Sequence, residues 1–212
     1  MKNLLLLVLL PPIVSFGQSL KVEIITETDI FGDKKSEISF LNGEKHGACK
    51  FYHSNGHLYS EVRYDHGKTT GVYRSYFSNG FMASKGKFME GKKEGLWKEF
   101  YENGQLSSQV EFKEGKEIEE SWVYYHDNGQ LMQKVTFVNG VREGRYKSFF
   151  KNGRVSSEGT YIQGERVGYW KRYFENGNLS GAGNYLNGVE NSDTWRFYDE
   201  TGKATQIRQD GC

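Results

Sequence analysis

Residues 95–106, Gly-Leu-Trp-Lys-Glu-Phe-Tyr-Glu-Asn-Gly-Gln-Leu, carry the pattern that decides the fold. An aromatic pair lies shortly before an Asn-Gly dipeptide, and apolar and polar residues alternate after it. Asn-Gly is a strong β-hairpin signal, because both central residues of a type I′ turn need positive φ and these two residues tolerate it best. The stretch predicts two β-strands joined by a type I′ turn at Asn103-Gly104.

The same pattern recurs along the chain with a period of about 24 residues. Glycines of the first series are 24, 24, 25, 24, 24 and 25 residues apart: Gly56, Gly80, Gly104, Gly129, Gly153, Gly177 and Gly202. Eleven residues after each first-series glycine from Gly56 to Gly177 comes a glycine of a second series: Gly67, Gly91, Gly115, Gly140, Gly164 and Gly188. Gly43 begins this second series, ahead of Gly56. Two turns per period imply two strands per period, hence one hairpin per repeat.

Aromatic residues occupy fixed positions in each repeat. Eight residues after the first-series glycine stand Tyr64, Phe88, Phe112, Phe137, Tyr161 and Tyr185. Seven residues before it stand Tyr73, Trp97, Trp122, Tyr146, Trp170 and Trp195, with Cys49 in the first repeat. The residue four before it is aromatic in all seven repeats. Positions seven and four before the glycine have opposite parity, so either a bulge intervenes or both faces of the sheet carry aromatics.

The predicted fold class is all-β, a solenoid-like open sheet of tandem antiparallel β-hairpin repeats without helices. Because a lone hairpin cannot bury its aromatics, stacked neighbours must supply the core, so the repeats form one domain. The expected organisation is a signal peptide at 1–17, a degenerate capping repeat at 18–40, seven repeats at 41–205 and a tail at 206–212.

The first residues have the composition of a signal peptide. A short basic start precedes an apolar run from Leu4 to Leu10, and cleavage is expected between Gly17 and Gln18. The apolar run is too short for the roughly 20 residues of a membrane span, so no transmembrane segment is expected. The mature protein is expected to be exported, either periplasmic or secreted.

The net charge restricts the classes of possible partner, and the two cysteines allow one disulfide. The chain has 28 Lys and Arg against 27 Asp and Glu, and loss of Lys2 with the signal peptide leaves the mature chain neutral. Nucleic acids and anionic lipid surfaces favour basic binders, so neither is expected as a partner. Cys49 and Cys212 could form a disulfide; otherwise Cys49 is a small buried residue and Cys212 a free or intermolecular thiol.

The repeat in residues 95–106 and 112–116 resembles the MORN-repeat variant of the YwqK-type family, which carries an antitoxin label. The resemblance covers roughly residues 38–205, with departures at Glu119 and at Asn191 to Asp193, where a residue is gained. It implies an interaction scaffold, and the antitoxin label implies a toxin as partner. Export separates this protein from any toxin in the cytoplasm of its own cell. The role that remains under the antitoxin label is immunity against a toxin that enters the periplasm from outside.

Chemical motifs are few. Four histidines lie near hairpin turns: His46, His53, His57 and His66. We expect the pair 46/66 at one end of the strands and the pair 53/57 at the other, too far apart to bind one metal ion. They are therefore interpreted as solvated turn residues, and no metal site is expected. The spacings typical of nucleophile elbows, zinc proteases, redox cysteines and calcium loops do not occur. No catalytic residues and no cofactor are expected, so the protein is predicted not to be an enzyme.

The aromatic stripe, defined here as Tyr73, Trp97, Trp122, Tyr146, Trp170 and Trp195, has two interpretations. The favoured interpretation is that these side chains form part of the core, because each aromatic side chain buries about 150–250 Å² of surface. Alternatively, an exposed part of it binds a partner. The expected function is a non-catalytic scaffold that binds another protein of unknown identity. A cell-wall or glycan binder is the alternative from another class, although comparable wall-binding repeats have a shorter period of about 20 residues.

Overall fold

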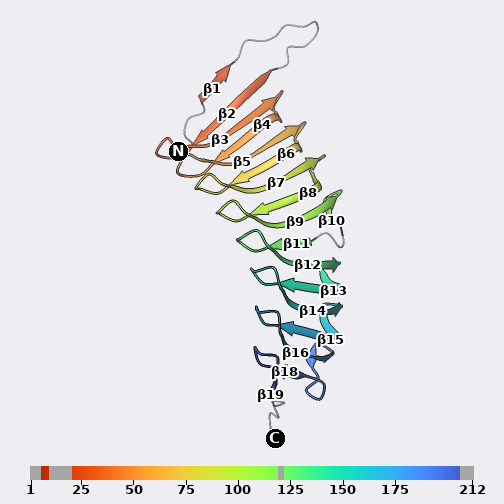
Figure 1. Cartoon of the computed structure of the whole chain (residues 1–212). Helices are drawn as coiled ribbons and strands as arrows, with labels where there is room; N and C mark the ends of the chain where they lie inside the picture. Colours follow the sequence, from red (N-terminus) through yellow and green to blue (C-terminus); the bar gives the residue numbers. More distant parts are fainter. Residues whose placement is uncertain (1–5, 10–20, 119–121, 206–212) are drawn as a thin grey trace. The chain divides into compact units, whose positions relative to one another are not determined.

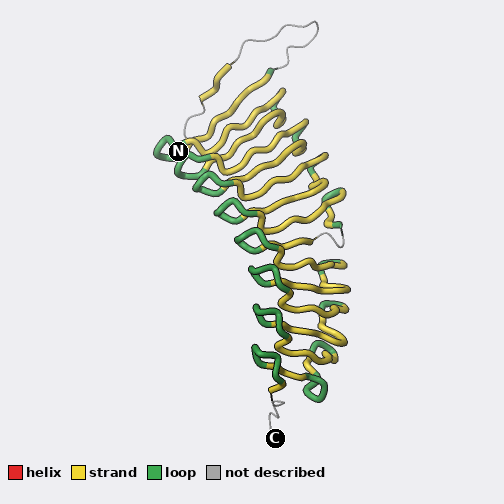
Figure 2. Tube along the Cα trace, in the orientation of Figure 1, coloured by secondary structure: helices red, strands yellow, loops and turns green. Residues whose placement is uncertain are grey.

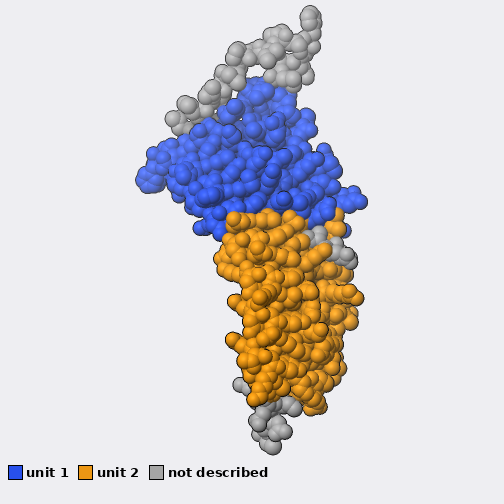
Figure 3. Space-filling model, viewed as in Figure 1, with its two compact units in different colours: residues 1–104, 111–116 blue, residues 105–110, 117–212 orange. Residues whose placement is uncertain are grey.

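The structure is a computed structural model that describes residues 6–9, 21–118 and 122–205 (Figures 1 and 2). Every helix or strand within these residues is a β-strand, and the strands pair antiparallel with strands near them in the chain to form an open sheet. The predicted fold class, tandem β-hairpins repeating about every 24 residues, is therefore confirmed. The chain divides into two compact units, residues 1–104 with 111–116 and residues 105–110 with 117–212 (Figure 3).

The first unit contains eight complete strands, in which each pairs with the next. They are β1 (Leu6–Leu9), β2 (Val22–Thr28), β3 (Lys34–Leu41), β4 (Glu44–Tyr52), β5 (Leu58–Asp65), β6 (Lys68–Tyr76), β7 (Met82–Met89) and β8 (Lys92–Phe100). β1 falls within the predicted signal peptide and pairs along the outer side of β2. The predicted cleavage site at Gly17 and Gln18 lies outside the described residues.

The second unit also consists of antiparallel strands, most of which pair with the next strand along the chain. Its complete strands are β11 (Trp122–Tyr125), β12 (Leu131–Val138), β13 (Val141–Phe149), β14 (Val155–Ile162), β15 (Glu165–Tyr173), β16 (Leu179–Leu186), β17 (Val189–Glu190), β18 (Arg196–Tyr198) and β19 (Ala204–Thr205). β9 (Leu106–Lys113) and β10 (Lys116–Glu117) contain residues of both units. The predicted departure at Glu119 lies outside the described residues, whereas Asn191 to Asp193 form a longer turn between β17 and β18.

The two turns of each hairpin period have different geometries, and the prediction of type I′ turns at Asn-Gly is wrong. At the Asn55-Gly56 turn only the glycine has positive φ, 82°. Its hydrogen bonds, Gly56 N to His53 O and His53 N to His57 O, define a three-residue loop with a glycine bulge. The second-series turns have positive φ at both central residues, as at Glu90 and Gly91 (50° and 81°), so these are the type I′ turns.

The Asn side chain has another role, which explains its recurrence. Asn55 Oδ1 accepts a hydrogen bond from the His57 backbone N–H, and its Nδ2 donates to the carbonyl of Ser78 in the next repeat. The same contact to the next turn is made within the two units by Asn79, Asn128, Asn152 and Asn176. Each Asn therefore shapes its own turn and connects that turn to its neighbour.

Bulges occur at the same place in successive hairpins. Between β14 and β15, Glu158 pairs with Lys171 but Thr160 pairs with Val167, so Gly159 faces three residues. The bulged strand includes Gly168 at φ 62°, a conformation that glycine adopts without strain. A second shift falls between Arg172 and Tyr173. The sequence allowed two explanations for aromatics at positions of opposite parity: a bulge between them, or aromatics on both faces of the sheet. Both apply, because bulges are present and aromatics occur on both faces.

The buried residues form a separate cluster in each unit. Ile38, Cys49 and Val62 form the cluster of the first unit, with Phe51 and Tyr73 among the residues packed on it. Tyr161, Trp170, Tyr185 and Trp195 form the cluster of the second. Cys49 is only 1% exposed, as one of its two interpretations predicted, and it is a free cysteine; Cys212 lies outside the described residues.

Helices long and apolar enough to cross a membrane are absent from the described part of the chain.

Candidate functional site

The aromatic stripe lies mainly inside the protein. Trp97, Trp170 and Trp195 are 6%, 1% and 1% exposed, whereas Tyr73, Trp122 and Tyr146 are half-buried. The Trp170 ring makes edge contacts with Tyr161 and Tyr185, with ring centroids 5.1 and 5.7 Å apart. Such edge-to-face contacts stabilise the core beyond the area they bury. The tryptophans thus connect successive hairpins within each unit.

Glycines make room for the tryptophans. A Cβ on Gly86 would lie 2.2 Å from the Trp97 ring, and one on Gly183 would lie 2.5 Å from Trp195. Where the stripe carries the smaller tyrosine, as at Tyr73 and Tyr146, the residue eleven positions earlier is valine. The exception is Trp122, which follows Val110: it is half-buried and stacks on Tyr124 at 5.5 Å.

A row of cationic side chains covers the edge of this core. Lys93 Nζ lies 4.4 Å from the Trp97 ring centroid and 4.7 Å from that of Phe112, and Arg166 lies 4.8 Å from Trp170. Such cation–π contacts are worth about 0.5–2 kcal/mol. Sequence reasoning missed this row, although a signal existed: Lys45, Lys93, Arg142 and Arg166 all stand two residues after a second-series glycine.

On the opposite face, tyrosines four residues before the turn glycine contact glutamates of the preceding strand. Tyr173 donates a hydrogen bond to Glu158 Oε1 at 2.8 Å, and Tyr52 donates to Glu37 Oε2 at 2.7 Å. Burial and the neighbouring carboxylate raise the pKa of Tyr173 to about 12. The hydrogen bond from Tyr173 lowers the pKa of Glu158, with Lys147 adding to the effect.

Charged rows on strands β12–β15 border a groove of about 840 Å³ in the second unit. Six of its lining residues carry charge: Lys134, Glu143, Arg145, Lys147, Glu158 and Lys171. Glu158 Oε2 lies 3.3 Å from Lys147 Nζ and its Oε1 lies 3.7 Å from Lys171 Nζ. Because four of the six charged residues are cationic, the groove carries more positive than negative charge. Sequence reasoning did not find this groove, because its residues come from four strands.

An exposed aromatic ring lies at the same groove. Tyr169 is 58% exposed and precedes the buried Trp170 in the chain. Neighbouring residues of a strand point to opposite faces, so Trp170 serves the core while Tyr169 is available at the surface. The sequence contained Tyr169 but only the structure places it beside the groove lysines.

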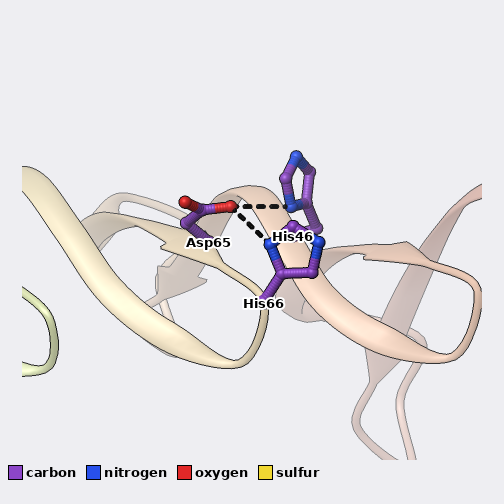
Figure 4. Close-up of side chains that lie close together, drawn as sticks. All are labelled: His46, Asp65 and His66. Carbon is purple, nitrogen blue, oxygen red and sulfur yellow. Dashed lines mark hydrogen bonds and ion pairs between the residues drawn. The ribbon is translucent and has the colours of Figure 1, made fainter.

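The four early histidines separate into two pairs, as the sequence predicted. His53 Nε2 and His57 Nδ1 contact the carbonyls of Tyr76 and Ser78. His46 and His66 lie at the other end of the strands, with ring centroids 5.2 Å apart. One carboxylate oxygen of Asp65 lies 3.3 Å from His46 Nδ1 and 2.8 Å from His66 Nδ1 (Figure 4); sequence reasoning did not include this acidic neighbour.

Comparison with known proteins agrees with the repeat geometry. Five segments, residues 45–66, 93–114, 121–139, 142–163 and 166–187, match the family described as MORN repeat variant. Together they make up half of the chain, and they coincide with the hairpins described above. This repeat protein therefore belongs to the MORN repeat variant family. No curated protein matches the chain at a significant level.

Proposed function

We propose that this chain is an exported, non-catalytic scaffold that binds another protein through the groove on β12–β15. MORN repeats are commonly protein-binding, and the second unit offers a groove bordered by Tyr169 and four cationic side chains. Tyrosine and charged residues of this kind are frequent in binding hot spots and in partner selection. The exposed Tyr169 beside Lys147 and Lys171 is the observation that carries the proposal.

The charge of the groove indicates the chemistry of the partner segment. Four cations against two carboxylates favour an acidic segment, and Glu143 is already engaged by the Gln163 backbone N–H at 2.8 Å. The volume of about 840 Å³ suits several side chains of an extended segment rather than a flat contact. Recognition then combines stacking on Tyr169 with ion pairs to the lysines.

Affinity capture with matched variants tests the binding proposal. The mature protein is immobilised as wild type, as Tyr169→Ala with Lys171→Glu, and as the control Val72→Ala, which changes the equivalent exposed position of the first unit. A partner retained by wild type and control but lost by the groove variant supports the proposal. Equal retention by all three proteins would overturn it, as would retention on peptidoglycan or glycan without a protein partner.

The export part of the proposal has its own measurement. Mass spectrometry of the protein from its native cell should find an N-terminus at Gln18 in the periplasmic or secreted fraction. A cytoplasmic protein that retains residues 1–17 would contradict export without affecting the binding experiment.

A further inference from the structure

His46, Asp65 and His66 form the one group of three potential metal ligands found in the described ranges of the chain. His46 comes from β4, Asp65 ends β5, and His66 begins the following turn (Figure 4). One ligand atom from each residue lies within 4.8 Å of the other two. The hairpin register brings them together, because Gly67 N donates to Lys45 O and fixes the turn beside His46.

Comparison with the other repeats shows that this group is specific to one hairpin. At the position of His46, two later repeats carry Glu94 and Glu143, whose carboxylates accept backbone hydrogen bonds from Glu114 and Gln163 at 2.8 Å. An imidazole in this place leaves the buried Nδ1 of His46 without a hydrogen bond. Asp65 Oδ1 lies at an ion-pair distance of 3.3 Å from this nitrogen.

The position of Asp65 is also unusual. The equivalent residue before the second turn is apolar or a lysine in every other described hairpin: Leu41, Met89, Lys113, Val138, Ile162 and Leu186. His66 takes the left-handed position of the type I′ turn, with φ 43°, and its Nδ1 lies 2.8 Å from Asp65 Oδ1. Two histidines and a carboxylate thus replace the structural contact seen elsewhere.

We propose that His46, Asp65 and His66 bind a divalent transition-metal ion of the zinc type. Zinc prefers imidazole nitrogen and carboxylate oxygen at about 2.0–2.2 Å in tetrahedral geometry, which places neighbouring ligand atoms roughly 3.3 Å apart. The two nitrogen–oxygen distances, 3.3 and 2.8 Å, are close to that value. Water or a partner side chain completes the fourth position, because Asp65 and His66 are exposed.

Zinc titration of the mature protein tests the proposal, with a purification tag that contains no histidine. The variants copy residues found at the same positions in other repeats: His46→Thr follows Thr70, and His66→Asn follows Asn139 and Asn187. Asp65→Asn removes the carboxylate charge. The control His57→Asn removes a turn histidine at the other end of the strands. Far-UV circular dichroism verifies that each variant is folded.

Wild type and His57→Asn are expected to bind one zinc ion per chain by isothermal titration calorimetry. Each ligand variant should bind at least about tenfold more weakly, since even outer-shell changes cost 10–100-fold. Zinc should also raise the Tm of wild type and of the control only. Absence of saturable binding by wild type, or equal binding by folded His46→Thr, would overturn the proposal. These results do not depend on the groove of the second unit.

Discussion

Gly159 lies directly against the ring of Trp170: a Cβ at position 159 would come within 2.1 Å of Trp170 Cδ2. No real side chain tolerates that distance, so the absence of a side chain at 159 is what allows Trp170 to be 1% exposed. In the preceding repeat, valine replaces this glycine and tyrosine replaces this tryptophan: Val135 lies across from residues 144–146, which include Tyr146. Packing in this protein is therefore set by pairs of residues in adjacent strands.

Enlarging Gly159 should destabilise the protein. Gly159→Ala is expected to lower the free energy of unfolding by about 1–3 kcal/mol, because the ring must move to admit the methyl group. Urea denaturation of the intact chain measures the change. Gly159→Val should cost more, and combining it with Trp170→Tyr, which copies the Val135–Tyr146 pair, should recover part of the loss. A double variant no better than Gly159→Val would contradict the pairing.

The Tyr173–Glu158 hydrogen bond predicts two pH-dependent losses of stability. The pKa of Tyr173 is raised to about 12 in the folded protein, so its contribution is complete below its unfolded pKa of about 10 and is lost between about pH 10 and 12. The pKa of Glu158 is lowered, so its contribution is present above its unfolded pKa and is lost as pH falls through the folded pKa.

Denaturation midpoints measured against pH for wild type and Tyr173→Phe test this. The variant should lose less stability than wild type at both extremes. Tyr198→Phe is the control, because Ala182 stands where Glu158 stands for Tyr173. If Tyr198→Phe and Tyr173→Phe change the profile equally, the hydrogen bond does not cause the dependence.

The type I′ turns predict opposite effects of two substitutions at Gln163, which has φ 50°. Gln163→Asn should stabilise the protein by a few tenths of a kcal/mol, because Asn tolerates the left-handed region and already occupies it at Asn139. Gln163→Val should destabilise it by about 1–2 kcal/mol, because a β-branched residue is strained there. Thermal unfolding provides the measurement, and a Gln163→Val protein as stable as Gln163→Asn would contradict the assignment of a type I′ turn at this position.

The thiol of Cys49 is expected to react slowly in the folded protein. Burial raises its pKa, and alkylation requires the thiolate. In a Cys212→Ser background, iodoacetamide at pH 8 should label the native chain far more slowly than the urea-unfolded chain. Equal rates would show that the first unit does not bury this residue.

The amino-acid sequence by itself determined the hairpins, their period and the rows of aromatics, because turn glycines and two-residue alternation are local signals. It also placed His46 and His66 at one end of the strands and His53 and His57 at the other. It gave the wrong turn type at Asn55-Gly56, because the same dipeptide suits two loop geometries and strand register chooses between them.

Contacts between neighbouring strands decided which side chains are buried and which of them meet. Whether Trp170 is core or surface depends on the space above Gly159, and the groove at Tyr169 depends on four strands lying in register. The meeting of His46 with Asp65 likewise follows from pairing across β4 and β5. Bulges shift this register by amounts that the alternation of residues does not encode, so only the tertiary structure shows which side chains meet.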